Sequence, residues 1–143
     1  MTDTLSRLGF TKYRTLARDI TTTVHGFVLP KSFMDFLECS EPPNMPLNFR
    51  FTHLSGEEWE GQVAEFVGIC PHPDDFEWLE SQVTVRDGHA YLPIACDSGG
   101  NYIYIVLSKP QGPVVDVEYS TGAFSEVAPS FSSFLEKLYH SDV

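Results

Sequence analysis

The segments AYLPIACDSGGNYIYIVL at residues 90–107, VVDVEY at 114–119 and APSFSSFLEKL at 128–138 decide the fold of this chain. The first two are rich in β-branched and aromatic residues and are separated by glycine and proline, which is typical of strands joined by turns. The third has its apolar residues on one helix face, at the spacing of an amphipathic helix that packs on a sheet. The residues of this face are Phe131, Phe134, Leu135, Leu138 and Tyr139.

Two of the expected strands differ in how their side chains alternate. Residues 102–107 are apolar at every position, which predicts a central strand with both faces covered. In the next strand Val115 and Val117 alternate with Asp116 and Glu118. We therefore expect that strand to have one buried face and one face in water.

The rest of the chain mixes helical and extended patterns, so we expect an α+β fold. Its core would be a mainly antiparallel, twisted sheet of about five or six strands with helices on one side. No linker or repeat interrupts the pattern, and residues 1–143 are expected to form a single domain. The upstream elements expected are a helical segment at 3–20, a helix opened by Pro30 at 31–39, strands at 47–54 and 62–70, a polar turn at 56–61 and a helix that starts at Asp74.

The composition is that of a folded protein. The 143 residues are 42% hydrophobic and 13% aromatic, enough to bury a core. The first twenty residues have scattered basic side chains and no apolar stretch of a secretory signal, and the longest apolar run is too short to cross a bilayer. Three cysteines at wide spacing do not suggest a disulfide framework. We expect a soluble, cytoplasmic protein with reduced thiols.

The charge is strongly acidic. Nine Lys and Arg residues against twenty Asp and Glu residues give a net charge of −11. This balance argues against nucleic-acid binding, because nucleic-acid binders concentrate basic side chains on their binding face. It favours encounter with a basic protein partner, although acidity also serves solubility alone.

No pattern indicates catalysis or a metal. The five histidines are dispersed, and the chain has no HExxH or Gly-x-Ser-x-Gly motif. The adjacent carboxylates Glu57-Glu58 and Asp74-Asp75 diverge from each other on any regular element. Cys70-Pro71-His72 lacks the second ligand pair of a zinc site. We expect no catalytic residue, no metal and no cofactor.

Two segments place a tryptophan among carboxylates. Tryptophan is a frequent anchor of protein interfaces, and complementary charge sets association rate and partner choice. Each ring also has a purely structural interpretation, in which Trp78 belongs to the core and Trp59 covers a sheet edge. The expected wet face of the strand at 114–119 would extend the acidic surface. The candidate partner-binding residues are Glu57, Glu58, Trp59, Glu60, Asp74, Asp75, Glu77, Trp78, Asp116 and Glu118.

Several motifs resemble one known family in their order along the chain. They are Leu29-Pro30 followed by Phe33, Phe36 and Leu37; Leu92-Pro93-Ile94; the turn Asp97-Ser98-Gly99-Gly100-Asn101; and Ala128-Pro129-Ser130-Phe131 with Phe134 and Leu135. Together they cover residues 29–138 and resemble the SUKH superfamily, the Smi/Knr-type domain.

The resemblance implies a non-enzymatic binding protein. Many bacterial SUKH members resemble immunity proteins, which neutralise a toxin, often a nuclease, deployed between competing cells. The expected partner is then a basic toxin domain. A second hypothesis is a Smi/Knr-type regulatory scaffold or interaction module with a cellular protein partner. A third, a hydrolase, would need carboxylates and histidines that meet only in space. None of these hypotheses specifies an oligomeric state.

Overall fold

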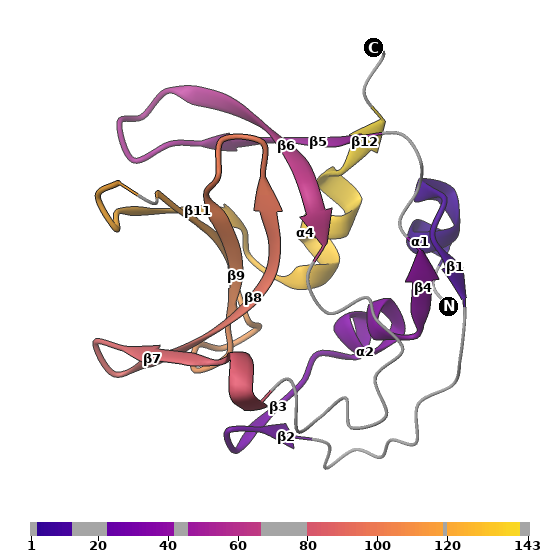
Figure 1. Ribbon diagram of the computed structural model, residues 1–143, viewed down its shortest axis with the longest axis horizontal. Helices are drawn as coiled ribbons and strands as arrows, with labels where there is room; N and C mark the ends of the chain where they lie inside the picture. The colour runs from indigo at the N-terminus through magenta and orange to yellow at the C-terminus, as the bar shows by residue number, and fades with distance from the viewer. Residues whose placement is uncertain (1–2, 13–22, 42–45, 67–79, 119, 141–143) are drawn as a thin grey trace.

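An eight-stranded antiparallel sheet is the main element of the fold. The computed structural model describes residues 3–12, 23–41, 46–66, 80–118 and 120–140. In spatial order the strands are β11 (Phe124–Ala128), β10 (Val114–Val117), β9 (Tyr102–Val106), β8 (His89–Asp97), β6 (Glu58–Phe66), β5 (Leu47–Thr52) and β12 (Tyr139–His140), and β7 (Thr84–Arg86) also pairs with β8 (Figure 1).

The sheet curls until its two ends approach each other. β11, at one end of the strand order, lies beside β5, which is next to the other end. Across this seam the Leu54 N–H donates a hydrogen bond to the Ser125 hydroxyl (3.1 Å). The result is a half-barrel with a concave inner face and a convex outer face (Figure 1).

The predicted α+β class and antiparallel sheet are confirmed, but the predicted number of strands is wrong. β7 has three residues and β12 has two. Strands this short contain too few positions for side-chain alternation to reveal them.

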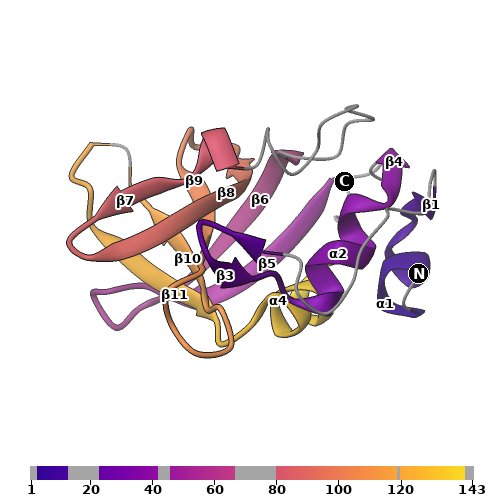
Figure 2. The same cartoon turned by 90° about the horizontal axis from the view of Figure 1, so that it is seen from below.

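Helices α1 (Asp3–Leu8), α2 (Lys31–Leu37) and α4 (Phe131–Lys137) lie on the inner side of the sheet (Figures 1 and 2). Phe134 of α4 packs on Phe49 of β5, with ring centroids 5.7 Å apart. Phe131 of α4 packs edge-on against Phe33 and Phe36 of α2, at 5.2 and 5.3 Å. All five rings are fully buried, so a phenylalanine cluster forms the centre of the core.

The C-terminal helix agrees with its predicted stripe, whose first four residues are buried. The strand expected at 102–107 is also confirmed as central, because β9 pairs with both β8 and β10. Its two faces are not equally covered, however. Ile103 and Ile105 are fully buried on the inner face, whereas Tyr104 is half-buried and Tyr102 is exposed on the outer face.

The helical segment predicted at 3–20 is confirmed at residues 3–8 and wrong at residues 9–12. α1 ends at Leu8, and Gly9 takes a φ of 97°, a left-handed conformation that ends helices. Thr11–Lys12 then form strand β1, which pairs with β4 (Cys39–Glu41). Residues 13–22 lie outside the described part of the chain.

Two more predicted boundaries differ. The helix expected at 31–39 ends at Leu37, because Cys39 already belongs to β4. The polar turn expected at 56–61 is shorter, since β6 begins at Glu58 and Trp59 therefore lies on a strand. Most of the helix expected from Asp74 lies outside the described residues, and residues 80–82 are helical.

A small hairpin of β2 (Thr23–Val24) and β3 (Phe27–Val28) precedes α2. The His25 N–H in its turn donates to the Glu80 carboxylate (2.8 Å), which ties the hairpin to the helical turn at 80–82. Within the described ranges, no helix has both the length and the apolar character needed to span a membrane.

Candidate functional site

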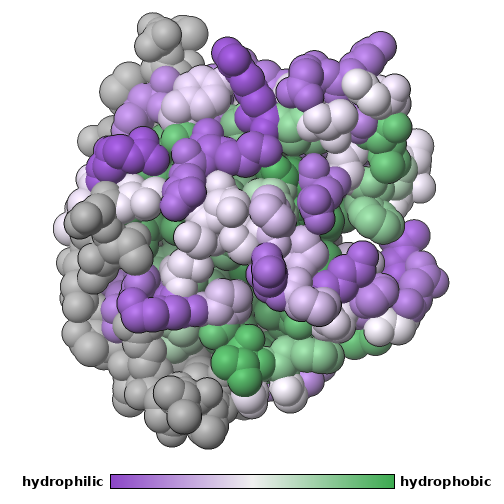
Figure 3. All heavy atoms as spheres, turned by 180° about the vertical axis from the view of Figure 1, so that it is seen from behind, coloured by the Kyte–Doolittle hydropathy of each residue, from purple (hydrophilic) through white to green (hydrophobic). Residues whose placement is uncertain are grey.

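Three hairpin turns gather at one end of the half-barrel, which we call the tip end. They join β5 to β6, β7 to β8 and β10 to β11, and they lie together on the left in Figures 1 and 2. Four of the six large apolar side chains that are exposed in the described structure lie here: Leu54, Trp59, Val85 and Phe124. On the face seen in Figure 3, hydrophilic side chains are mixed with apolar ones. Clustered exposed apolar side chains mark interaction sites.

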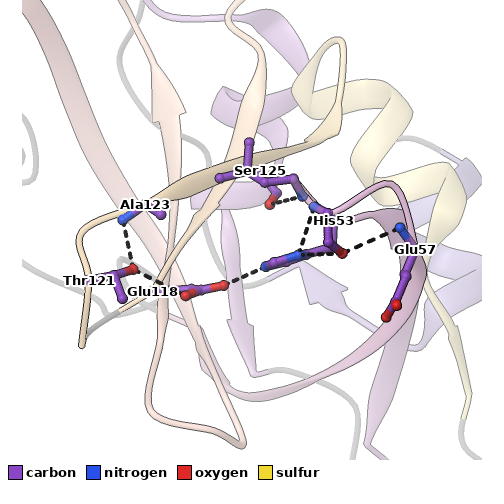
Figure 4. A network of polar contacts seen from close by, with 8 residues as sticks. His53, Glu57, Glu118, Thr121, Ala123 and Ser125 are labelled. Carbon is purple, nitrogen blue, oxygen red and sulfur yellow. Dashed lines mark hydrogen bonds and ion pairs between the residues drawn. The ribbon is translucent and has the colours of Figure 1, made fainter.

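His53 is at the centre of a polar network at the tip end (Figure 4). Its Nε2 lies 2.5 Å from Oε1 of Glu118, which connects the end of β5 to the end of β10. The Ser55 N–H donates to Nδ1 (3.2 Å), so the neutral imidazole carries its proton on Nε2, facing Glu118. The Trp59 indole stacks on the imidazole, with centroids 3.6 Å apart and planes at 9°. His53 therefore fixes both a carboxylate and an exposed tryptophan.

Glu118 receives hydrogen bonds from two sides. Besides His53, the Thr121 hydroxyl donates to its Oε2 (3.1 Å). The pKa of Glu118 is lowered, because the hydrogen bond from His53 first and that from Thr121 second stabilise the charged form. Thr121 also accepts the Ala123 N–H (3.1 Å), which fixes the turn between β10 and β11. The site therefore presents a negative charge at neutral pH.

Asp116 lies two residues before Glu118 on the same face of β10, deeper in the half-barrel. The residue is only 4% exposed, and its Oδ2 has no hydrogen-bond partner among the described atoms. Burial, followed by a hydrogen bond with Asp97 and the charges of Asp97 and Glu118, raises the pKa of Asp116 to about 8. Asp116 is thus mostly protonated at neutral pH.

The expectation that Asp116 faces water is wrong. β10 pairs with β9 on one side and β11 on the other, and the curl of the sheet turns its Asp116 face inward. Val117, expected on a buried face, is half-exposed on the outer face instead. The alternation of side chains was correctly predicted, and Val115 is buried as expected, but the expected exposure is wrong at Asp116 and Val117.

A protein-family model matches residues 21–137, and it describes the SMI1/KNR4 family (SUKH-1). The chain belongs to this family. The match includes nearly all of residues 29–138, over which the sequence motifs resemble SUKH domains, and confirms that resemblance. Comparison with curated proteins and with solved structures found no match. SUKH domains are generally non-catalytic.

The SUKH-1 domain brings part of the acidic segment at residues 57–60 to the tip end. Trp59 lies opposite Phe51 on the inner side of the strand pair and is 41% exposed at the tip end. Glu57 is exposed in the adjoining turn, and its carbonyl accepts the His53 N–H (2.8 Å). Together with Glu118, these residues form one surface, which we call the rim.

Glu58 and Glu60 point to the other side of β6. The Thr52 hydroxyl donates to Glu58 (2.5 Å), so this exposed carboxylate stays close to the rim. Glu60 accepts a hydrogen bond from the Tyr139 hydroxyl and lies 3.5 Å from the Arg50 guanidinium. Glu60 is therefore engaged with the opposite edge of the sheet. The second acidic segment, with Asp74, Asp75, Glu77 and Trp78, lies outside the described residues.

Three residues of the site were not among the sequence candidates: His53, Asp97 and Ser125. His53 follows Phe49 and Phe51 at a spacing of two residues, so it shares their inner face of β5. This spacing could have predicted its position next to the core. No local pattern predicts a role for Asp97 or Ser125. Asp97 acts on Asp116 and Ser125 accepts the Leu54 N–H only once the folded sheet brings these residues together.

The contacts around His53 bear on the hydrolase hypothesis. Ser55 Oγ lies 3.1 Å from Nδ1, so Ser55, His53 and Glu118 touch in the order seen in Ser-His-acid enzymes. The Ser55 N–H shares the same Nδ1, however, and Ser55 Oγ also accepts the Glu57 N–H (3.4 Å), which are contacts of a local turn. Among the described residues, no group of three or more His, Cys, Asp or Glu side chains is placed to hold a metal. The arrangement holds an aromatic ring and a carboxylate rigidly at a rim, as a binding surface requires.

Proposed function

We propose that this SUKH-1 domain is a non-enzymatic immunity protein that binds and neutralises a basic toxin domain in the cytoplasm. Family membership carries the proposal, because SUKH domains commonly act as immunity proteins. A nuclease toxin fits the charge of the chain particularly well, since a site that attracts phosphate is basic and the chain carries −11.

The rim supports this proposal as the contact surface. Trp59 offers a large aromatic face that is already immobilised by His53, so little conformational entropy is lost when a partner covers it. Leu54, 63% exposed, adds apolar area beside it. Glu57, Glu58 and Glu118 supply negative charge around these anchors, which attracts a basic partner and orients it.

The test begins with capture of partners from the source cells on tagged protein, washed at low and then at high salt. We expect a basic domain that arrests growth when it is expressed alone and ceases to do so when the SUKH-1 protein is co-expressed. Reversing the charge of Glu57 in the rim and of Glu58 next to it, with Glu57→Lys and Glu58→Lys, should weaken its binding by about tenfold or more, because like charges then face each other.

The matched control reverses two exposed charges away from the rim, Glu65→Lys and Glu136→Lys, and changes the net charge by the same amount. We expect it to lower affinity much less than the rim variant. Equal loss in both variants would contradict the rim as the contact surface. Recovery of a cell-wall or signalling protein in place of a toxin would contradict the immunity function and favour the scaffold hypothesis.

A further inference from the structure

The outer face of the tip end contains a groove that the rim does not include. It is a cavity of about 100 Å³ where the turn of the β7–β8 hairpin leans over β9, β10 and β11. Three aromatic side chains, one valine and one guanidinium line it: Tyr91, Tyr104, Phe124, Val117 and Arg86. Phe124 is 45% exposed, so the groove opens to solvent at the edge of the sheet.

The groove is held open by fixed contacts. The Arg86 guanidinium rests over Gly122 of the neighbouring turn, where a Cβ would lie only 3.1 Å from Nη2. Gly122 also has a φ of +73°, a conformation that favours glycine. Tyr91 and Tyr104 meet edge to face at 6.0 Å and form the floor. The walls are thus positioned before any ligand arrives.

We propose that this groove receives one aromatic or leucine-sized side chain of a protein partner, flanked by lysine or arginine. The inference rests on the proposed function and adds a second contact to the rim. At about 100 Å³ the groove is smaller than a cavity of about 150 Å³ that holds benzene, so it encloses part of one ring or one leucine side chain, which enters from the open side at Phe124. Buried aromatic anchors in such pockets dominate interface energetics.

Charge complementarity defines the residues that flank this anchor. Asp87 stands at the lip of the groove with its side chain 89% exposed, and Glu126 is exposed on the outer side of β11. The Arg86 guanidinium lies 4.0 Å from the Asp87 carboxylate, whose negative charge largely offsets the positive charge of Arg86. The surroundings of the groove therefore carry net negative charge in a chain of −11, which favours basic neighbours on the partner segment.

The test uses three acetylated, amidated peptides: Lys-Phe-Lys, Lys-Ala-Lys and Glu-Phe-Glu. Binding is followed by NMR from the shifts of the Tyr91, Tyr104 and Phe124 resonances in the full chain. We expect Lys-Phe-Lys to bind in the groove, and the other two to bind about tenfold more weakly or worse. Equal binding of Lys-Ala-Lys would overturn the proposal, since charge alone would then account for it.

Val117→Phe fills the groove and should abolish the Lys-Phe-Lys shifts. Val85→Phe is the matched control. Val85 lies between Thr84 and Arg86, which line the groove, but its own side chain is 64% exposed on the opposite face of β7. Thermal unfolding checks that both variants fold, and Phe124→Ala, which removes an exposed wall, tests the same point if Val117→Phe does not fold. Unchanged peptide binding in the folded groove variant would also overturn the proposal.

The peptide experiment needs no toxin, so its outcome is independent of the proposed function. Groove binding without any toxin to neutralise would reject the immunity function alone. Neutralisation of a toxin whose affinity survives Val117→Phe would reject the groove alone.

Discussion

Asp116 carries a carboxyl group that lies inside the half-barrel next to a second carboxyl group. Its pKa of about 8 in the folded protein compares with about 4 for an aspartate in an unfolded chain. The folded state therefore holds a proton that the unfolded state releases between these two values. Stability from this proton is fully present below about pH 4 and is lost as the pH rises toward 8.

Replacing the acid by its neutral isostere, Asp116→Asn, should remove this pH dependence. For wild-type protein we expect the free energy of unfolding to fall between pH 5 and pH 8, by at most about 1.4 kcal/mol for each pH unit. The variant should show a smaller fall over the same interval, measured by urea unfolding. Asp87→Asn, at an exposed carboxylate, is the control and should follow the wild type. A parallel curve for Asp116→Asn would show that Asp116 does not retain its proton.

Among the elements, β6 is shaped by a glycine that faces the core. A Cβ on Gly61 would overlap the ring of Phe49, which is fully buried on the paired strand. The absence of a side chain at this position lets the Phe49 ring of the paired strand β5 lie against the backbone of β6.

Gly61→Ala should destabilise the protein by about 1–3 kcal/mol, the usual cost of overpacking. The measurement is the midpoint and slope of chemical unfolding. Gly99→Ala provides the comparison, because its Cβ would meet Asp97 Oδ1 at an ordinary 3.4 Å. If both substitutions had the same small effect, the close approach of Phe49 to β6 would be contradicted.

Elements with a long, regular pattern could be predicted from the sequence. The stripe of α4 and the central place of β9 follow from local spacing, so neighbouring strands do not alter them. The assignment of faces in β10 could not be predicted in this way. In a flat sheet a charged residue between valines faces water, whereas here the curl encloses Asp116 and leaves Val117 half exposed.

The candidate site was predictable to the same degree. The exposure of Glu57 and Trp59 follows from a polar segment that holds a single large ring. The support beneath it could not be anticipated, because the bond from His53 to Glu118 joins residues 65 positions apart. Such a contact depends on how far the sheet closes, and no local pattern encodes that distance.

At the scale of the whole molecule, closure of the half-barrel depends on the seam between β5 and the β10–β11 hairpin. The described contacts across it include the hydrogen bond from the Leu54 N–H to Ser125 and the pair of His53 with Glu118. Ser125 is buried, so its hydroxyl is sheltered from competing water.

Ser125→Ala should let the Leu54 amide exchange with solvent about tenfold faster or more, because it loses its acceptor at the seam. Hydrogen exchange followed by NMR measures this directly. Thr121→Ala is the control: it frees the Ala123 amide and removes one hydrogen bond to Glu118, but it leaves the Leu54 hydrogen bond in place. Unaltered exchange of Leu54 in Ser125→Ala would mean that this end of the sheet is not closed by that bond.

The β10–β11 hairpin contributes Glu118 to the rim and Val117 and Phe124 to the groove, on opposite faces of the same ribbon. Insertion or loss of a single residue in this hairpin would reverse which side chains face inward. Length changes here would therefore disturb both contact surfaces at once, whereas point substitutions change one and spare the other. Diversification of partner choice in this lineage should proceed by substitution at constant hairpin length.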